Sequence, residues 1–256
     1  MKKILYFQCN TGISGDMTLG ALLDLGVDKE IFLDEINKLS IKNEFELKIE
    51  KKKVSGIEGT NVDVILKEHH HHEDEHEHHH GRHLADIYKI IDESKISKNA
   101  KALSKKIFEQ IGKAEAKVHG TTIDKIHFHE VGAVDSIVDI VGTAILVDML
   151  SIDKIYSTPI PFGKGFVKCD HGFMPLPAPA TIEILRGYEV KFTQIESELT
   201  TPTGAGIIKA LSSGILESED YSVNRIGYGL GNKELPIPNM LRAVLIEQKK
   251  KKNYMK

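Results

Sequence analysis

The residues best suited to metal chemistry lie in the segment 119–135, where three histidines and three acidic side chains occur close together. Its centre reads His-Phe-His-Glu, beginning at His127. Imidazole and carboxylate ligands suit borderline divalent ions such as zinc or nickel. In an extended backbone, His127 and His129 point to the same side and are predicted to hold one ion together, while Glu130 faces the other way. Loop histidines that are only solvated or hydrogen-bonded are the alternative interpretation.

A second histidine-rich stretch occupies residues 67–82. Its low complexity and high polarity cannot support a core, so the sequence predicts a mobile surface loop. Such a loop can bind Ni²⁺, Zn²⁺ or Cu²⁺ at several interchangeable sites, and we interpret it as a site of metal capture or delivery. A solvated loop without a role is the alternative. The predicted metal ligands here are His69, His70, His71, His72, His76, His78, His79 and His80.

Two glycine-bearing turns open helices and are candidate sites for an anion. The first contains Gly12, Ser14, Gly15 and Asp16, and follows an apolar strand; the second contains Thr201, Thr203 and Gly204. Free N–H groups and the helix dipole converge at such positions and attract phosphate or carboxylate groups. The Gly-Lys-Ser/Thr ending of a phosphate loop is missing, so a plain connection remains the alternative. The acid in the first turn is interpreted equally as a helix cap or as a functional acid.

Hydrophobic periodicity predicts the elements that position these residues. Two acidic residues, Asp135 and Asp139, fall one turn apart on a helix that is apolar nearly all round. Carboxylates on a buried helix are costly unless they are paired or bound to a cation, although the first of them also suits the helix dipole. We predict strands at 4–9, 45–53, 60–66, 154–160, 221–229 and 240–247, and helices at 16–25, 29–39, 83–93, 98–118 and 134–150. Two further helices are predicted, one that residues 174–180 open and that runs to 185, and one that residues 198–206 open.

Bulk composition narrows the class of protein. The chain has 256 residues, 41% hydrophobic residues and a formal net charge of −3 without a basic stripe, so nucleic acid is not an expected partner. Its two cysteines are far apart, which argues against a disulfide framework and favours a reducing compartment. No apolar run is long enough for a membrane span or a signal peptide. We therefore expect a cytoplasmic protein, and an oligomer of unspecified size.

The predicted fold class is α/β, or α+β, with a mixed sheet, packed helices and two lobes. We expect an N-terminal lobe at 1–66, the disordered histidine-rich loop at 67–82 and a main lobe at 83–248. A lysine-rich tail follows at 249–256, which we interpret as a truncation or frameshift point.

Taken together, these segments resemble the nickel insertion proteins (LarC family) of the lactate racemase cofactor pathway. The resemblance covers nearly the whole chain. It rests on residues 12–17, 82–84, 114–120, 127–140, 171–172, 175–181, 198–204 and 238–242.

The resemblance implies insertion of Ni²⁺ into pyridinium-3,5-bisthiocarboxylate mononucleotide, which forms one carbon–nickel and two sulfur–nickel bonds. It also implies a C-terminal domain that hydrolyses CTP with Mn²⁺ or Mg²⁺ and that this chain lacks, and it suggests apo lactate racemase as a recipient. The resemblance therefore implies a nickel-insertion lyase that is incomplete without the C-terminal domain.

A division of roles follows as a hypothesis. The histidine-rich stretch, through residues 69–80, gathers Ni²⁺, and His127 and His129 hold the ion. Glu130, Asp135 or Asp16 supplies acid–base chemistry. One of the two glycine-bearing turns binds the substrate phosphate. Two rival hypotheses stay open: a nickel store or metallochaperone that works only through its loop, and a metal-dependent hydrolase.

Overall fold

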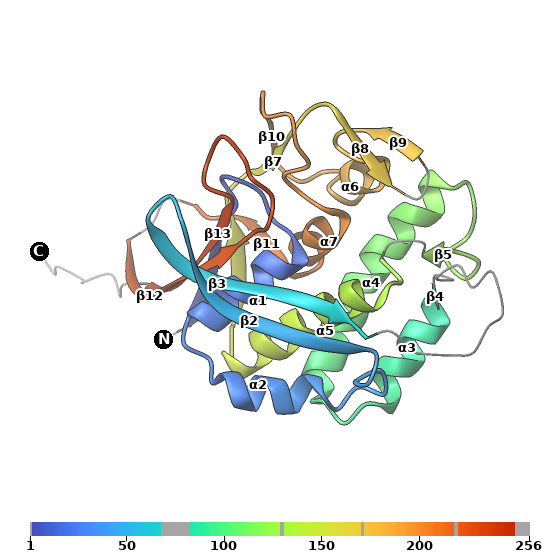
Figure 1. The fold of residues 1–256 in the computed structure, drawn as a ribbon, viewed down its shortest axis with the longest axis horizontal. Coiled ribbons are helices and arrows are strands. Elements are labelled where there is room, and N and C mark those ends of the chain that lie inside the picture. Colours follow the sequence, from blue (N-terminus) through green and yellow to red (C-terminus); the bar gives the residue numbers. More distant parts are fainter. Residues whose placement is uncertain (1, 68–81, 129–130, 170–171, 218–219, 249–256) are drawn as a thin grey trace, which may run out of the picture.

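A mixed seven-stranded sheet is the largest sheet of the molecule, and the helices pack against it (Figure 1). The computed structural model describes residues 2–67, 82–128, 131–169, 172–217 and 220–248. In spatial order the strands are β11 (Ser212–Ile215), β6 (Lys154–Ser157), β1 (Lys3–Gln8), β13 (Met240–Gln248), β12 (Tyr221–Leu230), β3 (Ile57–Leu66) and β2 (Phe45–Val54). Strands β11, β6 and β1 run parallel, and β13 pairs antiparallel with both of its neighbours.

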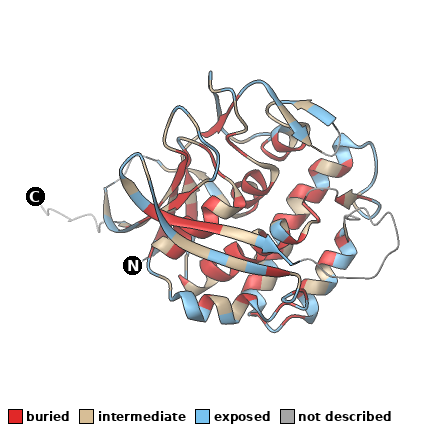
Figure 2. Ribbon diagram, viewed as in Figure 1, coloured by how far each residue is buried: buried red, intermediate tan, exposed pale blue. Residues whose placement is uncertain are grey.

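Seven helices in the described part of the chain pack against this sheet and on one another. They are α1 (Gly15–Asp24), α2 (Lys29–Ile36), α3 (Leu84–Glu93), α4 (Lys98–Val118), α5 (Val134–Met149), α6 (Pro179–Ile184) and α7 (Pro202–Leu211). Helix α1 lies on β3, β12 and β13, and α5 packs on α1, α2, α4 and α7. Because helices surround α5, its side chains are buried on almost every side, which explains its unbroken apolar sequence (Figure 2).

The predicted α/β class is confirmed, and several elements were placed closely by their periodicity, α4 above all. The predicted strand 154–160 was wrong as a single element, because β6 ends at Ser157 and a separate strand, β7 (Ile160–Phe162), begins after Pro159 and pairs with β10 (Val190–Phe192). Proline has no N–H to donate, so a ladder readily ends beside it.

Strands from both sides of residues 67–82 take part in one sheet, and a single apolar cluster contains residues from both. Two short two-stranded antiparallel ladders also occur: β4 (Arg82–His83) with β5 (His127–Phe128), and β8 (Phe166–Cys169) with β9 (Gly172–Pro175). In the described residues, no helix is both long and apolar enough to span a bilayer.

Candidate functional site

The two glycine-bearing turns meet in space, although almost 190 residues of chain separate them. Ile13 and Thr200 form an isolated parallel bridge, in which Ile13 N donates to Leu199 O (3.0 Å) and Thr201 N donates to Ile13 O (3.2 Å). The bridge places the N-terminus of α1 beside that of α7. Sequence analysis predicted each turn separately, and the structure joins them into one junction, which we call the helix junction (residues 12–16 and 200–204).

Small residues make the close approach in the helix junction possible. Gly12 has a φ of +120°, and a Cβ there would lie 2.8 Å from the carbonyl carbon of Leu199. A Cβ at Gly204 would lie 2.6 Å from the carbonyl carbon of Ile13. Real Cβ atoms do not approach carbonyl carbons this closely, so any larger residue at either position would force the turns apart. Two of the three predicted substrate-binding glycines, Gly12 and Gly204, therefore hold the junction together.

Side chains in the helix junction already occupy part of its hydrogen-bonding capacity. Thr201 caps α7, because its Oγ1 accepts from Gly204 N (3.2 Å). Ser14 occupies the N-cap of α1 but gives no side-chain cap; its Oγ donates instead to Asp16 Oδ1. Thr203 is buried at 7% exposure. An acid thus lies at the N-terminus of α1, which makes this end more suitable for a positive group than for a phosphate.

Asp139 brings a second carboxyl group against the helix junction. Its side chain reaches from α5 to Gly15, and a Cβ at Gly15 would lie 2.5 Å from both Asp139 Cβ and Cγ. Oδ1 of Asp139 is buried and has no hydrogen-bond partner among the described residues. Burial raises the pKa of Asp139 well above its usual value, and the nearby charges of Asp16 and Asp135 raise it further.

Asp16 shares this environment. Burial raises its pKa most, the charge of Asp63 adds to the increase, and the hydrogen bonds from Ser14 and the Met17 amide oppose it. The predicted acid Asp135 is different: it is exposed in the first turn of α5, and its Oδ1 accepts from the adjacent Ser136 N (2.8 Å). The structure therefore brings together the predicted acid Asp16 and Asp139, which the sequence analysis identified only as a carboxylate that is costly to bury.

A carboxyl group on helix α1 whose hydrogen bonds are satisfied provides a contrast with Asp139 on α5. Asp24, at the C-terminal end of α1, accepts from Thr60 Oγ1 (2.7 Å), from Tyr228 N (2.9 Å) and from Lys51. Asp24 thereby ties α1 to the sheet, which is a structural role. The Asp139 Oδ1 atom receives no comparable hydrogen bond. Leaving a buried acceptor unpaired costs about 1–3 kcal/mol, so stability alone does not explain why an acid stands at this position. Such an atom is a good candidate for chemistry.

His127 lies elsewhere, in the short ladder that β5 makes with β4. Its partner across the ladder is His83, and the two ring centroids are 4.8 Å apart. The other predicted residues of that segment, His129 and Glu130, lie outside the described residues, as do all eight predicted ligands from His69 to His80. His83 was missed as a candidate because the two strands that align it with His127 are only two residues long and carry no periodic signal.

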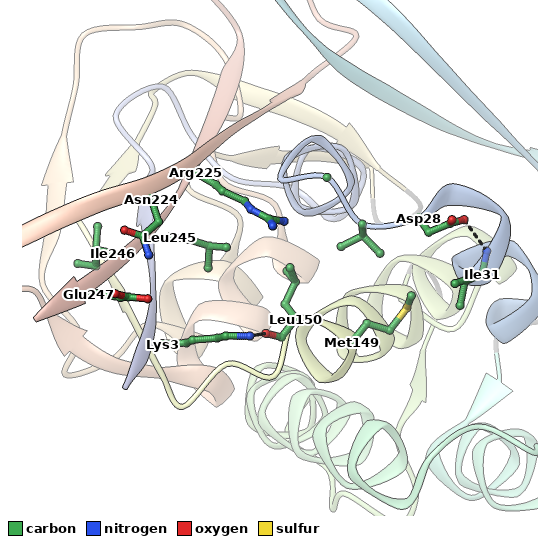
Figure 3. Close-up of a pocket in the computed structure, with 12 residues that line it drawn as sticks. Lys3, Asp28, Ile31, Met149, Leu150, Asn224, Arg225, Leu245, Ile246 and Glu247 are labelled. Atoms are coloured by element: carbon green, nitrogen blue, oxygen red, sulfur yellow. Dashed lines mark hydrogen bonds between the residues drawn. The ribbon is translucent and has the colours of Figure 1, made fainter. Parts of the chain in front are cut away.

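Two surface pockets formed by described residues contain no predicted site residue. The first, of about 470 Å³, lies at the C-terminal ends of α1 and α5 and is lined by Lys3, Asp28, Met149 and Arg225 among others (Figure 3). At about 1.5 Å per residue, the sixteen residues of α5 place Met149 about 20 Å from the helix start. The helix junction lies at the opposite, N-terminal ends of these two helices.

The described residues thus define an α/β protein with an acidic helix junction and a pair of facing histidines. This chain belongs to the nickel insertion protein family, whose model matches residues 5–256.

Individual relatives agree with the family. The chain is 49% identical over 251 residues to the pyridinium-3,5-bisthiocarboxylic acid mononucleotide nickel insertion protein of Acetivibrio thermocellus, covering 97% of this chain and 61% of the relative. It is 49% identical over 251 residues to the protein of the same name from Clostridium kluyveri, covering 97% of this chain and 63% of that one. The Staphylococcus epidermidis protein is 43% identical over 247 residues, covering 96% and 60%.

The chain therefore spans about 60% of the length of these curated relatives. No solved structure matches it.

Proposed function

We propose that this chain provides the substrate-holding and proton-accepting part of a nickel insertase (cyclometallase, a lyase) that acts on pyridinium-3,5-bisthiocarboxylic acid mononucleotide. The single observation that carries the proposal is the buried, unpartnered Asp139 oxygen at the helix junction, in a chain 49% identical to proteins named for this insertion. The substrate class comes from the names of those relatives.

The acids at the junction suit the chemistry that such an insertion requires. A pyridinium ring carries a positive charge, which complements Asp16 and Asp139 in a weakly solvated setting. Forming a carbon–nickel bond breaks one ring C–H bond, and the proton must pass to a base. A carboxyl group whose pKa is raised by burial accepts a proton more readily than an ordinary aspartate. In this proposal Asp139 accepts the ring proton, and Asp16 holds the ring.

Ni²⁺ is the second substrate, and imidazoles are suitable ligands for it. We assign its delivery to His127 and His129, with the tract His69–His80 as the collecting segment. The two sulfur atoms of the substrate then replace part of the protein's coordination as nickel is transferred.

CTP hydrolysis with Mn²⁺ or Mg²⁺ is assigned to the part of the relatives that extends beyond this chain. The described residues contain no group of three or more histidine, cysteine, aspartate or glutamate side chains arranged to hold a metal ion, so they do not fit such a site. We also propose that the complete protein works in the cytoplasm and supplies its product to apo lactate racemase.

The test is titration of the mononucleotide substrate into the intact chain and into Asp139→Asn, followed by insertion assays after the C-terminal portion of a relative, CTP, Mn²⁺ and Ni²⁺ are added. Product is detected by mass spectrometry. We expect Asp139→Asn to bind substrate with near-normal affinity and to lose at least 100-fold in insertion rate. Asp148→Asn, a change on the same helix at a carboxylate bound by Ser97 and Asn99, is the matched control.

Normal insertion by Asp139→Asn would refute the assigned base. Absence of substrate binding by the intact chain would refute the larger proposal and favour a metallochaperone that acts through its histidines alone.

A further inference from the structure

Two imidazole rings face each other across the β4–β5 ladder. His83 and His127 are directly paired residues, with ring centroids 4.8 Å apart and ring planes at 88°. Sequence analysis treated His127 as a ligand and His83 only as the first residue of a predicted helix. The ladder makes them neighbours although 44 positions separate them in sequence.

The hydrogen bonding of His83 fixes which ring nitrogen is available. Its Nδ1 lies 3.0 Å from the main-chain oxygen of Ile126, and a carbonyl can only accept, so Nδ1 carries the proton. In the neutral ring, Nε2 then carries the lone pair. Histidines that bind metals commonly donate their other N–H to a carbonyl in this way, which holds the ring orientation and increases its basicity. Since His83 is exposed, an ion can reach it.

The backbone that carries both rings is well anchored. Arg82 Nη2 pairs with Glu44 Oε2 (2.7 Å), and Arg82 Nη1 donates to Gly132 O (3.2 Å). His83 N donates to Asp86 Oδ2 (3.1 Å) at the start of α3, and Phe128, which follows His127, is 2% exposed. A metal would therefore bind to a preformed pair rather than order a loop, which lowers the entropic cost of binding.

The separation of the rings agrees with two ligands on one ion. A metal–nitrogen bond of about 2.1 Å places an imidazole centre about 3.2 Å from the metal, so two rings whose nitrogens meet the metal at a right angle have centres about 4.5 Å apart. The observed 4.8 Å is close to that value. Right-angled nitrogen ligands are typical of tetragonal Ni²⁺ and Cu²⁺ coordination.

We propose that His83 and His127 jointly bind one Ni²⁺ ion through imidazole nitrogens, with water in the remaining positions. The cation site itself stands independently of the proposed function. Its role as the last station of nickel before insertion rests on that function.

The experiment must separate this pair from the eight histidines of residues 69–80. All eight are replaced by asparagine in the full-length chain, and Ni²⁺ alone is titrated calorimetrically. In this background we expect one site per chain, weakened at least tenfold by His83→Asn and by His127→Asn. His119→Asn is the control, because His119 lies at the end of α4 with its Nε2 3.4 Å from Glu115 Oε2.

Protection from diethyl pyrocarbonate in the unsubstituted chain gives a second measurement. Ni²⁺ should slow modification of His83 and His127 together, as read from peptide mass spectra. His83 is exposed and occupies the N-cap of α3, where asparagine is a favoured residue, so His83→Asn should keep the fold. Its result therefore decides the proposal even if His127→Asn proves unstable.

Unchanged Ni²⁺ affinity in His83→Asn would overturn the site. If His83→Asn loses the Ni²⁺ site and the unsubstituted chain supports no insertion under any condition, the site is upheld and the proposed function is contradicted. Normal insertion with no Ni²⁺ site at the pair would do the reverse.

Discussion

The carboxyl group of Asp139 packs directly against the backbone of Gly15, so that helices α1 and α5 touch where a side chain would otherwise stand. Glycine at this position lets a polar group from a helix that is otherwise apolar reach the helix junction. The contact also brings Asp139 near Asp16, whose charge adds to the increase in the pKa of Asp139.

Gly15→Ala tests this contact. The added methyl group must displace Asp139, and overpacking of this kind typically costs about 1–3 kcal/mol. We expect a loss of that size in the free energy of unfolding, measured by urea denaturation. Gly112→Ala in α4 is the matched control: the nearest neighbours of the added methyl group would be the side-chain atoms Ile123 Cγ1 and Phe128 Cζ, both at 3.3 Å, so a much smaller adjustment is needed. Equal stability of the two variants would show that α1 and α5 separate without cost.

The pH dependence of stability should report Asp139. Since burial raises its pKa in the folded state, the folded protein keeps this proton at pH values where the unfolded chain has lost it. The favourable contribution is complete below about pH 4 and declines as pH rises towards the folded-state pKa, by about 1.4 kcal/mol for each unit of pKa difference. Asp139→Asn removes this decline, so its stability advantage over the unsubstituted protein should grow between pH 4 and pH 8.

Urea denaturation across that pH range is the measurement, with Asp148→Asn as the comparison on the same helix. An advantage that shrinks as pH rises would mean that the charged form of Asp139 is the stabilised one.

Thr201→Ala should destabilise α7 by about 1 kcal/mol, because it removes the hydroxyl that caps Gly204 N. Thr201→Ser keeps the hydroxyl and should retain most of that stability. If the cap also holds the helix junction in shape, substrate affinity should fall with alanine and recover with serine. Thermal denaturation and substrate titration on both variants separate the two effects, and identical behaviour of the two variants would remove any role for the hydroxyl.

Arg82→Gln should loosen the β4–β5 ladder. It removes both the ion pair with Glu44 and the bond to Gly132 O. Both partners are partly exposed, at 26% and 32%, so the coupling energy in a double-mutant cycle with Glu44→Gln should be only about 0.5–1 kcal/mol. A coupling energy near zero would mean that Arg82 anchors the ladder only through its hydrogen bond to the Gly132 carbonyl oxygen.

The sequence predicted the long elements well because their signals are local. The three- and four-residue spacing in α4 and the unbroken apolar run of α5 each point to one kind of helix, and the alternation around Val62 points to a strand that faces a core.

Pairing between distant segments carried no such signal. The bridge of Ile13 to Thr200 is a single residue pair, and the ladder that aligns His83 with His127 is two residues long. Asp139 was visible in the sequence as a costly carboxylate, but the space that it enters is created by Gly15, on a different helix. The acids were thus predictable as residue types, whereas their meeting point depends on tertiary packing.

The position of β13 has a consequence for how the protein is made. This strand lies between β1 and β12, and it pairs with β1 from Lys3 opposite Glu247 to Gln8 opposite Arg242. During synthesis, β1 must therefore wait until β13 has left the ribosome before its edge facing β13 is paired. Contacts of such long sequence separation slow folding and leave strand edges open to other chains. A nascent chain interrupted before residue 240 would carry complete helices on a divided sheet, which makes its early termination products natural clients of chaperones.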